Sequence, residues 1–320
     1  MNLKKIKSDI KGPVFPIITP FTKKHGVDYK KVREYIDFLY QGGARIFHVM
    51  VHSSRIGLLS EKEIIKLNKT VTNHTKSKYK DCIVIASGPI IGSTRLNIKI
   101  AEEAEKAGAD IIGIIFSERY YFKDQIVKYY KEIATRVKIG ILIHEEQLNS
   151  IHGTKKAQFP LDVLDKIAGI KNVVAIKEDS KNHEFSLKTI KLLKERLAII
   201  VSGAAKKQFL ASAPYGCHAY LVGVGNFAPL VATQFYKYYL EGNLEMCNEI
   251  INEIETPFLQ IAKELGWHIG LKSAMEITRV MNRDERPPLE KLSLTQHKKI
   301  ESVLKQIQNK SIWKKVNKQK

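Results

Sequence analysis

The chain has 320 residues and a formal net charge of +20, with 53 lysines and arginines against 33 aspartates and glutamates. Its hydrophobic share of 44% and charged share of 27% are typical of a folded globular protein and exclude a disordered chain. Every apolar run is far shorter than the roughly 20 residues that a membrane-spanning helix needs, and the charged N-terminus leads into Ser8-Asp9 rather than a secretory segment.

The positive charge favours negatively charged partners, of which nucleic acid is the first to consider. The lysines are spread through the whole chain and interleaved with acidic residues, so the charge indicates solubility and attraction of small carboxylates instead. Cys82, Cys217 and Cys247 lie far apart in apolar segments, which indicates reduced core residues in a cytoplasmic protein. Nucleic-acid binding therefore stays the less favoured alternative, and we expect no membrane partner.

Strand-like and helical patterns alternate from Pro13 to about Leu240. Asp28 opens a helical pattern that Gly42 ends, Ser60 begins a capping box, and Ser93 starts a third helix. Further helices are predicted over 123–136, 161–168, 184–196, 205–213 and 229–240. The predicted strands cover residues 14–18, 45–51, 82–86, 110–116, 138–143, 173–177, 198–201 and 219–223.

Eight strands that are each followed by a helix predict an α/β fold of the closed (β/α)8 barrel type, the TIM barrel. A doubly wound open sheet is the competing fold, but it needs a glycine-rich turn after the first strand, and Thr19-Pro20-Phe21-Thr22 has none. Beyond Gly242 only helical patterns remain. We therefore expect a barrel over 12–242, a C-terminal helical extension over 243–308, and basic, flexible termini over 1–11 and 309–320.

The sixth predicted strand ends in a lysine that is followed by Glu178-Asp179. Strand alternation puts Ala175 and Lys177 on one face. If that face points into a barrel, burial lowers the pKa of the Lys177 amine toward neutrality and makes it a nucleophile for a carbonyl carbon. A lysine that marks the exit of a strand into water is the plain alternative.

Functional groups in such barrels gather where the strands end. The hydroxyl, phenol and imidazole groups at these ends suit imine chemistry, in which an amine attacks and neighbouring groups move protons. No spacing typical of a metal site is present, and we expect no metal and no cofactor. The candidates besides Lys177 are His52, Ser53, Ser54, Tyr121, His144, Glu145, Ser202, Gly203 and Gly225.

Structural roles for these candidates stay open. His52 can cap the following loop, Tyr121 can pack at the rim, and the turns around Gly203 and Gly225 can be turns only. One of His144 and Glu145 should point inward, because the two follow a strand directly. His48 is interpreted as a core or helix-facing histidine.

The chain resembles the family of dihydrodipicolinate synthase and N-acetylneuraminate lyase, whose members are class I aldolases that act through a lysine imine. The resemblance extends from Gly12 to about Ile307. It rests on Pro16-Ile-Ile-Thr-Pro-Phe21, Val174-Ala-Ile-Lys-Glu178, Ser202-Gly203, Val222-Gly-Val-Gly-Asn-Phe-Ala-Pro229 and Arg286-Pro-Pro288. It implies that Lys177 forms the Schiff base with a 2-oxo acid, and that the protein is a dimer or tetramer.

Two motifs of the family are altered. The loop that holds the substrate carboxylate, Gly-Thr/Ser-Thr-Gly-Glu in the family, corresponds to Val51-His52-Ser53-Ser54-Arg55. By the resemblance, Ser53 and the backbone amides around it would hold the carboxylate. The family's proton-relaying tyrosine after the fifth strand is replaced by Ile143-His144-Glu145, so His144 or Glu145 would move protons together with Tyr121.

These observations predict a lyase or synthase that forms a Schiff base with pyruvate or a related 2-oxo acid. The imine would support aldol cleavage, condensation with an aldehyde, or dehydration. The alternative from another class is a family member that has lost turnover and binds a 2-oxo acid as a regulatory protein; the missing tyrosine favours it.

Overall fold

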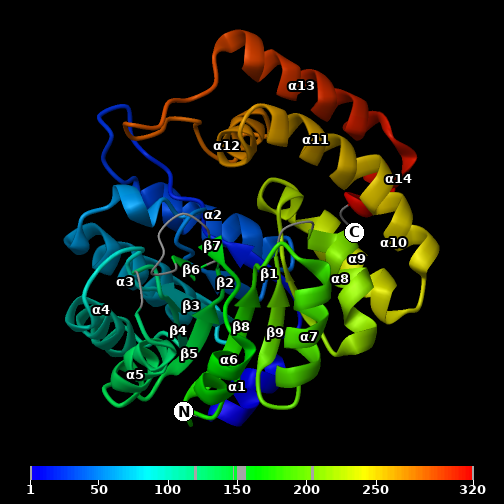
Figure 1. Cartoon of the computed structure of the whole chain (residues 1–320). Coiled ribbons are helices and arrows are strands. Elements are labelled where there is room, and N and C mark those ends of the chain that lie inside the picture. The colour runs from blue at the N-terminus through cyan, green and yellow to red at the C-terminus, as the bar shows by residue number, and fades with distance from the viewer. Residues whose placement is uncertain (1, 119–120, 147, 150–155, 203–204, 319–320) are drawn as a thin grey trace. The chain divides into compact units, whose positions relative to one another are not determined.

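The structure is a computed structural model that describes residues 2–118, 121–146, 148–149, 156–202 and 205–318. Eight parallel strands form a closed barrel in the order β1-β10-β9-β8-β5-β4-β3-β2, and helices alternate with them along the chain (Figure 1). The predicted (β/α)8 barrel with C-terminal helices is therefore confirmed. The barrel strands are β1 (Gly12–Pro16), β2 (Ile46–His48), β3 (Ile83–Ser87), β4 (Ile111–Ile115), β5 (Gly140–His144), β8 (Val173–Glu178), β9 (Ala198–Val201) and β10 (Ala219–Leu221).

Two short strands, β6 (Leu148–Asn149) and β7 (Lys156–Ala157), pair outside the barrel. The helices follow the predicted pattern closely, with Ser60 and Ser93 as N-caps. The helices are α1 (Leu3–Asp9), α2 (Tyr29–Gln41), α3 (Glu61–Lys78), α4 (Thr94–Lys106), α5 (Lys123–Ala134), α6 (Leu161–Ala168), α7 (His183–Leu193), α8 (Ala205–Ser212), α9 (Pro229–Leu240), α10 (Leu244–Ile250), α11 (Thr256–Glu264), α12 (Trp267–Ile277), α13 (Leu294–Asn309) and α14 (Ser311–Val316).

The described chain divides into two compact units, and the division differs from the predicted boundary at residue 242. One unit comprises residues 1–14 and 46–221, and the other comprises 15–45 and 222–320. In the second unit α2 packs closely on α9: a Cβ on Gly42 would lie 2.2 Å from Cγ of Pro229, and the Thr233 hydroxyl donates to the Gly42 carbonyl at 3.1 Å. Helix α9 also packs on α10 and α14, so the barrel's first and last helices belong with the C-terminal helices.

The expectation of flexible termini is wrong for residues 3–9 and 311–316, which are helical. Leu3 and Ile6 pack with Ile10 on the apolar core inside the barrel. Ile312 and Val316 are buried in the second unit. Apolar residues at helical spacing lie within both basic segments, and their burial stabilises the two short helices.

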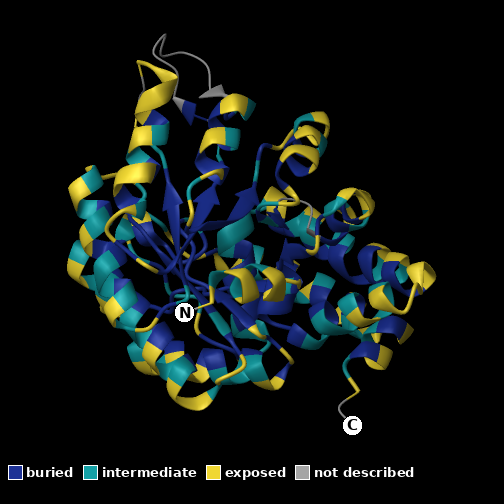
Figure 2. Ribbon diagram, turned by 90° about the horizontal axis from the view of Figure 1, so that it is seen from below, coloured by how far each residue is buried: buried dark blue, intermediate teal, exposed yellow. Residues whose placement is uncertain are grey.

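The interior of the barrel is layered. Ile46, Ile111, Leu142, Ala175 and Ile200 belong to one apolar core. Because side chains alternate along a strand, the residues two positions later form the next layer toward the C-terminal ends of the strands. Figure 2 shows the strands almost entirely buried and the helices exposed on their outer sides. This second layer, at the C-terminal ends of the strands, comprises His48, Gly113, His144, Lys177 and Ser202.

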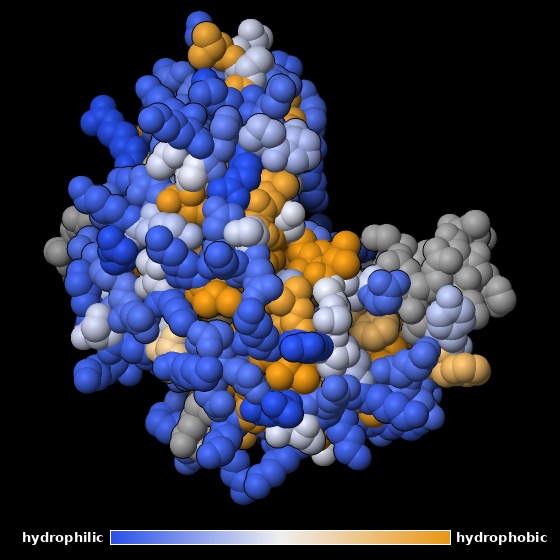
Figure 3. All heavy atoms as spheres, turned by 90° about the vertical axis from the view of Figure 1, so that its left-hand side faces the viewer, coloured by the Kyte–Doolittle hydropathy of each residue, from blue (hydrophilic) through white to orange (hydrophobic). Residues whose placement is uncertain are grey.

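The surface is dominated by hydrophilic residues on the face drawn in Figure 3, with hydrophobic residues gathered in smaller patches. Many lysines pair with carboxylates, as Lys69 does with Glu103 at 2.6 Å, so that part of the positive charge is locally neutralised. Among the described residues, the structure has no helix that combines the length and the apolar character needed to cross a bilayer.

Candidate functional site

Lys177 and His144 face each other near the C-terminal ends of two neighbouring strands. They are register partners in the parallel pair of β8 and β5, and both follow inward-facing residues by two positions. Nζ of Lys177 lies 2.9 Å from Nε2 of His144. The structure therefore places the predicted nucleophile and one of the two predicted proton-moving residues in direct contact.

A β-bulge sets this register. Ile141 pairs with Val173, whereas Leu142 pairs with Ala175, so Val174 is the extra residue on β8. Val174 packs at the position of Gly140, where a Cβ would lie only 2.6 Å from Cγ2 of Val174. The glycine thus leaves room for the bulge that brings Lys177 level with His144.

The amine of Lys177 is buried and has an anionic partner. The side chain is 2% exposed, and Nζ lies 2.5 Å from Oδ2 of Asp179. Burial lowers the pKa of Lys177 to about 8, while the negative charges of Glu146, Glu145 and Glu178 oppose that shift. At neutral pH a minor fraction of this amine is therefore uncharged, far more than for an ordinary lysine.

Two buried histidines beside Lys177 stay neutral at physiological pH. Burial, followed by the positive charge of Lys177, lowers the pKa of His144 well below its ordinary value and that of His48 to about 3. His48 points into the barrel, because its Nε2 lies 3.2 Å from the position of a Cβ on Gly113. Its Nδ1 is buried without a hydrogen-bond partner among the described residues.

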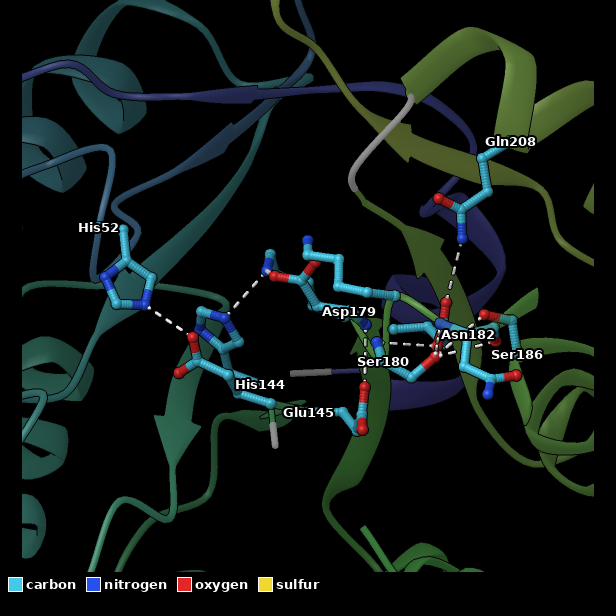
Figure 4. A network of polar contacts seen from close by, with 12 residues as sticks. His52, His144, Glu145, Asp179, Ser180, Asn182, Ser186 and Gln208 are labelled. Atoms are coloured by element: carbon cyan, nitrogen blue, oxygen red, sulfur yellow. Dashed lines mark hydrogen bonds and ion pairs between the residues drawn. The ribbon is translucent and has the colours of Figure 1, made fainter. Parts of the chain in front are cut away.

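The turn after β8 holds Asp179 against the amine. Figure 4 shows the network of polar contacts that braces this turn. Glu145 accepts the backbone N–H of Asp179 at 2.9 Å, and Glu178 accepts that of Ser180 at 3.1 Å. The backbone of Lys181 has φ +60°, and its amine pairs with the other oxygen of Asp179. A left-handed conformation at a non-glycine residue costs of the order of 1 kcal/mol, and it lies here next to the site.

Glu145 is a support of this turn and is not in contact with the amine among the described contacts. Its Oε1 is buried without a hydrogen-bond partner, and burial together with the charge of Glu178 raises the pKa of Glu145 to about 8. Of the two predicted proton-moving residues, His144 is the one with a described contact to the Lys177 amine, and the choice between them stays a prediction.

The loop after β2 uses most of its polar groups internally. The amides of Ser54, Arg55 and Ile56 donate to backbone carbonyls of the same loop, and the Ser54 hydroxyl accepts the N–H of Met50 at 2.9 Å. These three amides already have acceptors within the loop, so the expectation that they hold a carboxylate stays a prediction. Ser53 is buried, and His52 bonds Glu146 at 3.1 Å and meets the His144 ring edge-on, with the ring centres 6.2 Å apart.

Among the contacts that the structure describes, none joins the other candidates to the Lys177 amine. Tyr121 is 61% exposed, and among the described contacts none joins it to Lys177, so the structure does not support its proton-moving role within one chain. Ser202 is buried, and its amide donates to the Glu178 carbonyl at 3.1 Å. Gly203 lies outside the described residues. Gly225 is packed within the second unit, where a Cβ would lie 3.0 Å from that of Ala232.

A separate cavity of about 390 Å³ opens between α4 and α5. Its lining includes Ser93, Glu118, Lys128 and Glu132 together with apolar residues, but not Lys177.

Sequence reasoning missed Asp179, whereas the interpretation of His48 as a core histidine agrees with its burial. Asp179 follows Lys177 by two residues, but β8 ends at Glu178, so strand alternation does not extend to Asp179.

Comparison with known proteins shows similarity to one protein family over nearly the whole chain. The model of the dihydrodipicolinate synthetase family matches residues 9–307. A 4-hydroxy-tetrahydrodipicolinate synthase of Archaeoglobus fulgidus is 26% identical over 309 residues, covering 93% of this chain and 98% of the relative. A probable 5-dehydro-4-deoxyglucarate dehydratase of Bacillus subtilis is 23% identical, covering 95% of this chain and 96% of the relative.

Solved structures share the fold. The crystal structure of dihydrodipicolinate synthase from Oceanobacillus iheyensis has a TM-score of 0.84 at 20% identity and covers 97% of this chain and all of that one. The structure of YagE, a prophage protein of the same family from E. coli K12 in complex with pyruvate, has a TM-score of 0.81 at 18% identity and covers 93% and 98% of the two chains.

The barrel with a buried lysine at the end of a strand defines a lyase of the class I aldolase type, as the sequence predicts. The chain belongs to the dihydrodipicolinate synthetase family.

Proposed function

We propose that the protein forms an imine between Lys177 and pyruvate or a related 2-oxo acid. The contact between the buried Lys177 amine and the neutral His144 ring, 2.9 Å apart, carries this proposal. The imine withdraws electrons from the neighbouring carbon, so that a C–C bond can break or an enamine can form and attack an aldehyde. The pyruvate complex of YagE supports the choice of 2-oxo acid.

His144 takes the position of the family's tyrosine in this proposal. Its Nε2 reaches the reacting nitrogen, and a neutral imidazole can accept a proton there and return it. The relatives include synthases and dehydratases, and both reactions can pass through the same imine.

Borohydride trapping tests the proposed imine at Lys177. The protein is incubated with pyruvate and sodium borohydride, and the adduct is located by peptide mass spectrometry. We expect a single reduced adduct on Lys177 in the wild type and none in Lys177→Ala. The absence of an adduct across a panel of 2-oxo acids would remove the proposal.

The ion pair between Lys177 and Asp179 is the observation that favours the alternative, a 2-oxo acid binder without turnover, because a carboxylate stabilises the unreactive ammonium form. Calorimetric binding of pyruvate without trapping at any pH between 6 and 10 would select this alternative.

We propose further that the protein is a cytoplasmic homo-oligomer. Ile91 and Phe122 are each 73% exposed on loops that follow β3 and β4, and Tyr121 lies beside Phe122. A second copy that covers these side chains would remove them from water. The three cysteines are buried and none of them forms a disulfide, which agrees with a reducing compartment. Light scattering of the wild type and of a Phe122→Ser variant tests the assembly: a monomeric wild type contradicts it.

A further inference from the structure

We infer that Asp179 is a catalytic residue that takes the proton from the Lys177 amine and delivers it to the departing water during imine formation. The inference rests on the proposed imine at Lys177. Its basis is the contact between the reacting nitrogen and a carboxylate that the surrounding structure holds in place, with Oδ2 2.5 Å from Nζ.

The carboxylate is built into the site. The Asp179 side chain is 10% exposed, and its backbone N–H donates at 2.9 Å to Glu145, which directly follows the neighbouring strand β5. Ser180, the next residue, forms two hydrogen bonds that hold the turn. Glu178 accepts its amide, and the hydroxyls of Ser180 and Ser186 are 3.2 Å apart. Glu145 and Glu178 are thus positioning residues for Asp179 and do not themselves touch the amine.

The position of Asp179 suits proton transfer in both directions. His144 and Asp179 contact the same nitrogen, so the amine lies between a neutral base and an anionic one. Other charged or titratable groups that act on the amine are Glu145 and Glu146 after β5, Glu178 on its own strand, and Lys181, which shares the Asp179 carboxylate. The buried His48 on β2 interacts with Lys177 as a neutral ring.

The step balances without a further reactant. Asp179 removes a proton from the Lys177 ammonium, and the freed nitrogen pair attacks the C2 carbonyl, whose π electrons move to oxygen. A proton moves from nitrogen to that oxygen, through His144 or Asp179, to give the carbinolamine. Protonated Asp179 then donates to the hydroxyl, water leaves, and the nitrogen pair forms the C=N bond. The product is a protonated imine beside the regenerated Asp179 carboxylate.

The variant Asp179→Asn separates this role from simple support of the fold. Removing the carboxylate removes the acid and also the anion that stabilises the ammonium form. We expect the borohydride-trapping rate with pyruvate to fall about 100-fold at its maximum. The midpoint of its pH dependence should move to lower pH by about one unit. A residue that only supports the turn would leave that midpoint in place.

Two further variants keep the test decisive. Asp179→Glu retains an acid one methylene further out, and we expect an intermediate rate with a midpoint near that of the wild type. Asp162→Asn is the matched control, because exposed Asp162 forms a similar pair with Lys123 on the surface, at 3.1 Å. We expect it to trap at the wild-type rate.

Labelling of Lys177 by acetic anhydride, quantified by mass spectrometry across pH, reads the proton affinity of the amine without any 2-oxo acid. It should show the same downward shift for Asp179→Asn. An unchanged midpoint together with a trapping rate within threefold of the wild type overturns the role of Asp179 and leaves the imine proposal intact. A wild type that traps no 2-oxo acid overturns the imine proposal, and with it the catalytic part of this inference.

Discussion

Lys177 and His144 are direct register partners on β8 and β5, and their side-chain nitrogens lie 2.9 Å apart inside the barrel. A lysine ammonium has only donors, so the neutral His144 ring accepts from it at Nε2 when its own proton is on Nδ1. The register thereby gives the nucleophile a base from the neighbouring strand. A slip of β8 by one residue against β5 would turn Lys177 out of the barrel and away from His144.

Replacing His144 should slow imine formation without removing the nucleophile. We expect His144→Leu to lower the rate of borohydride trapping with pyruvate about 100-fold, because the imidazole no longer moves protons at the nitrogen. His144→Gln keeps a polar side chain that does not titrate in this range. Its trapping rate should lie between the rates of the wild type and of His144→Leu. The exposed His218 provides a control, since His218→Leu should leave the rate unchanged. A full rate in His144→Leu would exclude the imidazole from the reaction.

The pH dependence of trapping should report the Lys177 amine. Burial lowers its pKa to about 8, and only the uncharged amine attacks a carbonyl. The trapping rate should therefore rise with pH from 6, reach half of its maximum near pH 8 and level off by about pH 9. An ordinary lysine would keep rising to beyond pH 10. Stopped reactions analysed by intact mass at half-unit pH intervals measure the curve, and a midpoint above pH 10 would contradict a buried, perturbed amine.

The barrel and its nucleophile could be predicted because both depend on local regularity. Strand alternation carries Lys177 into the interior once Ala175 is assigned there, and the structure keeps that relationship. Asp179 could not be placed in this way, because it follows the strand in a turn. Its position depends on a hydrogen bond to Glu145, which lies 34 residues earlier, directly after strand β5.

The roles of Tyr121 and of the loop at Ser53 could not be predicted from local regularity. Their roles came from the resemblance to a family, and a family motif fixes neither exposure nor hydrogen bonding in an altered loop. The Ser54 hydroxyl and three amides serve the loop itself. The N-terminal helix was missed because basic residues dominate its composition, although Leu3, Ile6 and Ile10 form the apolar stripe that packs on the core.

The stability of the protein should depend on pH through Glu145. Burial and the charge of Glu178 raise its pKa to about 8 in the folded state, against 4.5 for the free side chain. The folded state thus holds a proton that the unfolded state has lost, and the contribution of Glu145 to stability falls as pH rises from about 4.5 to 8. Glu145→Gln can still accept the Asp179 amide through its carbonyl oxygen but cannot ionise.

The free energy of unfolding of Glu145→Gln should therefore rise relative to the wild type by at least about 1 kcal/mol between pH 5 and pH 8. Urea unfolding of both proteins across that range measures the difference, which also cancels the opposite contributions of the buried histidines. Exposed Glu290 serves as the control, and Glu290→Gln should show no such trend. A difference that is constant with pH would mean that Glu145 is ionised in the folded protein.

The fit between Gly140 and Val174 should appear as energetic coupling. A Cβ at residue 140 would lie 2.6 Å from Cγ2 of Val174 and 3.1 Å from Cγ1 of Ile111, so Gly140→Ala should lower the free energy of unfolding by about 1 to 3 kcal/mol. Val174→Ala alone should also destabilise, because it removes buried methyl groups.

The double variant should be more stable than the sum of the two single effects predicts, by about 1 kcal/mol, because the smaller side chain makes room for the new methyl. Val231 is buried on α9 in the other unit, and Gly140→Ala combined with Val231→Ala should be additive. In the variant that combines Gly140→Ala with Val174→Ala, the steric clash is only partly removed, since Ile111 still limits the space. Additivity of Gly140→Ala and Val174→Ala would show that the bulge does not depend on the glycine, and the register of Lys177 and His144 would then have another cause.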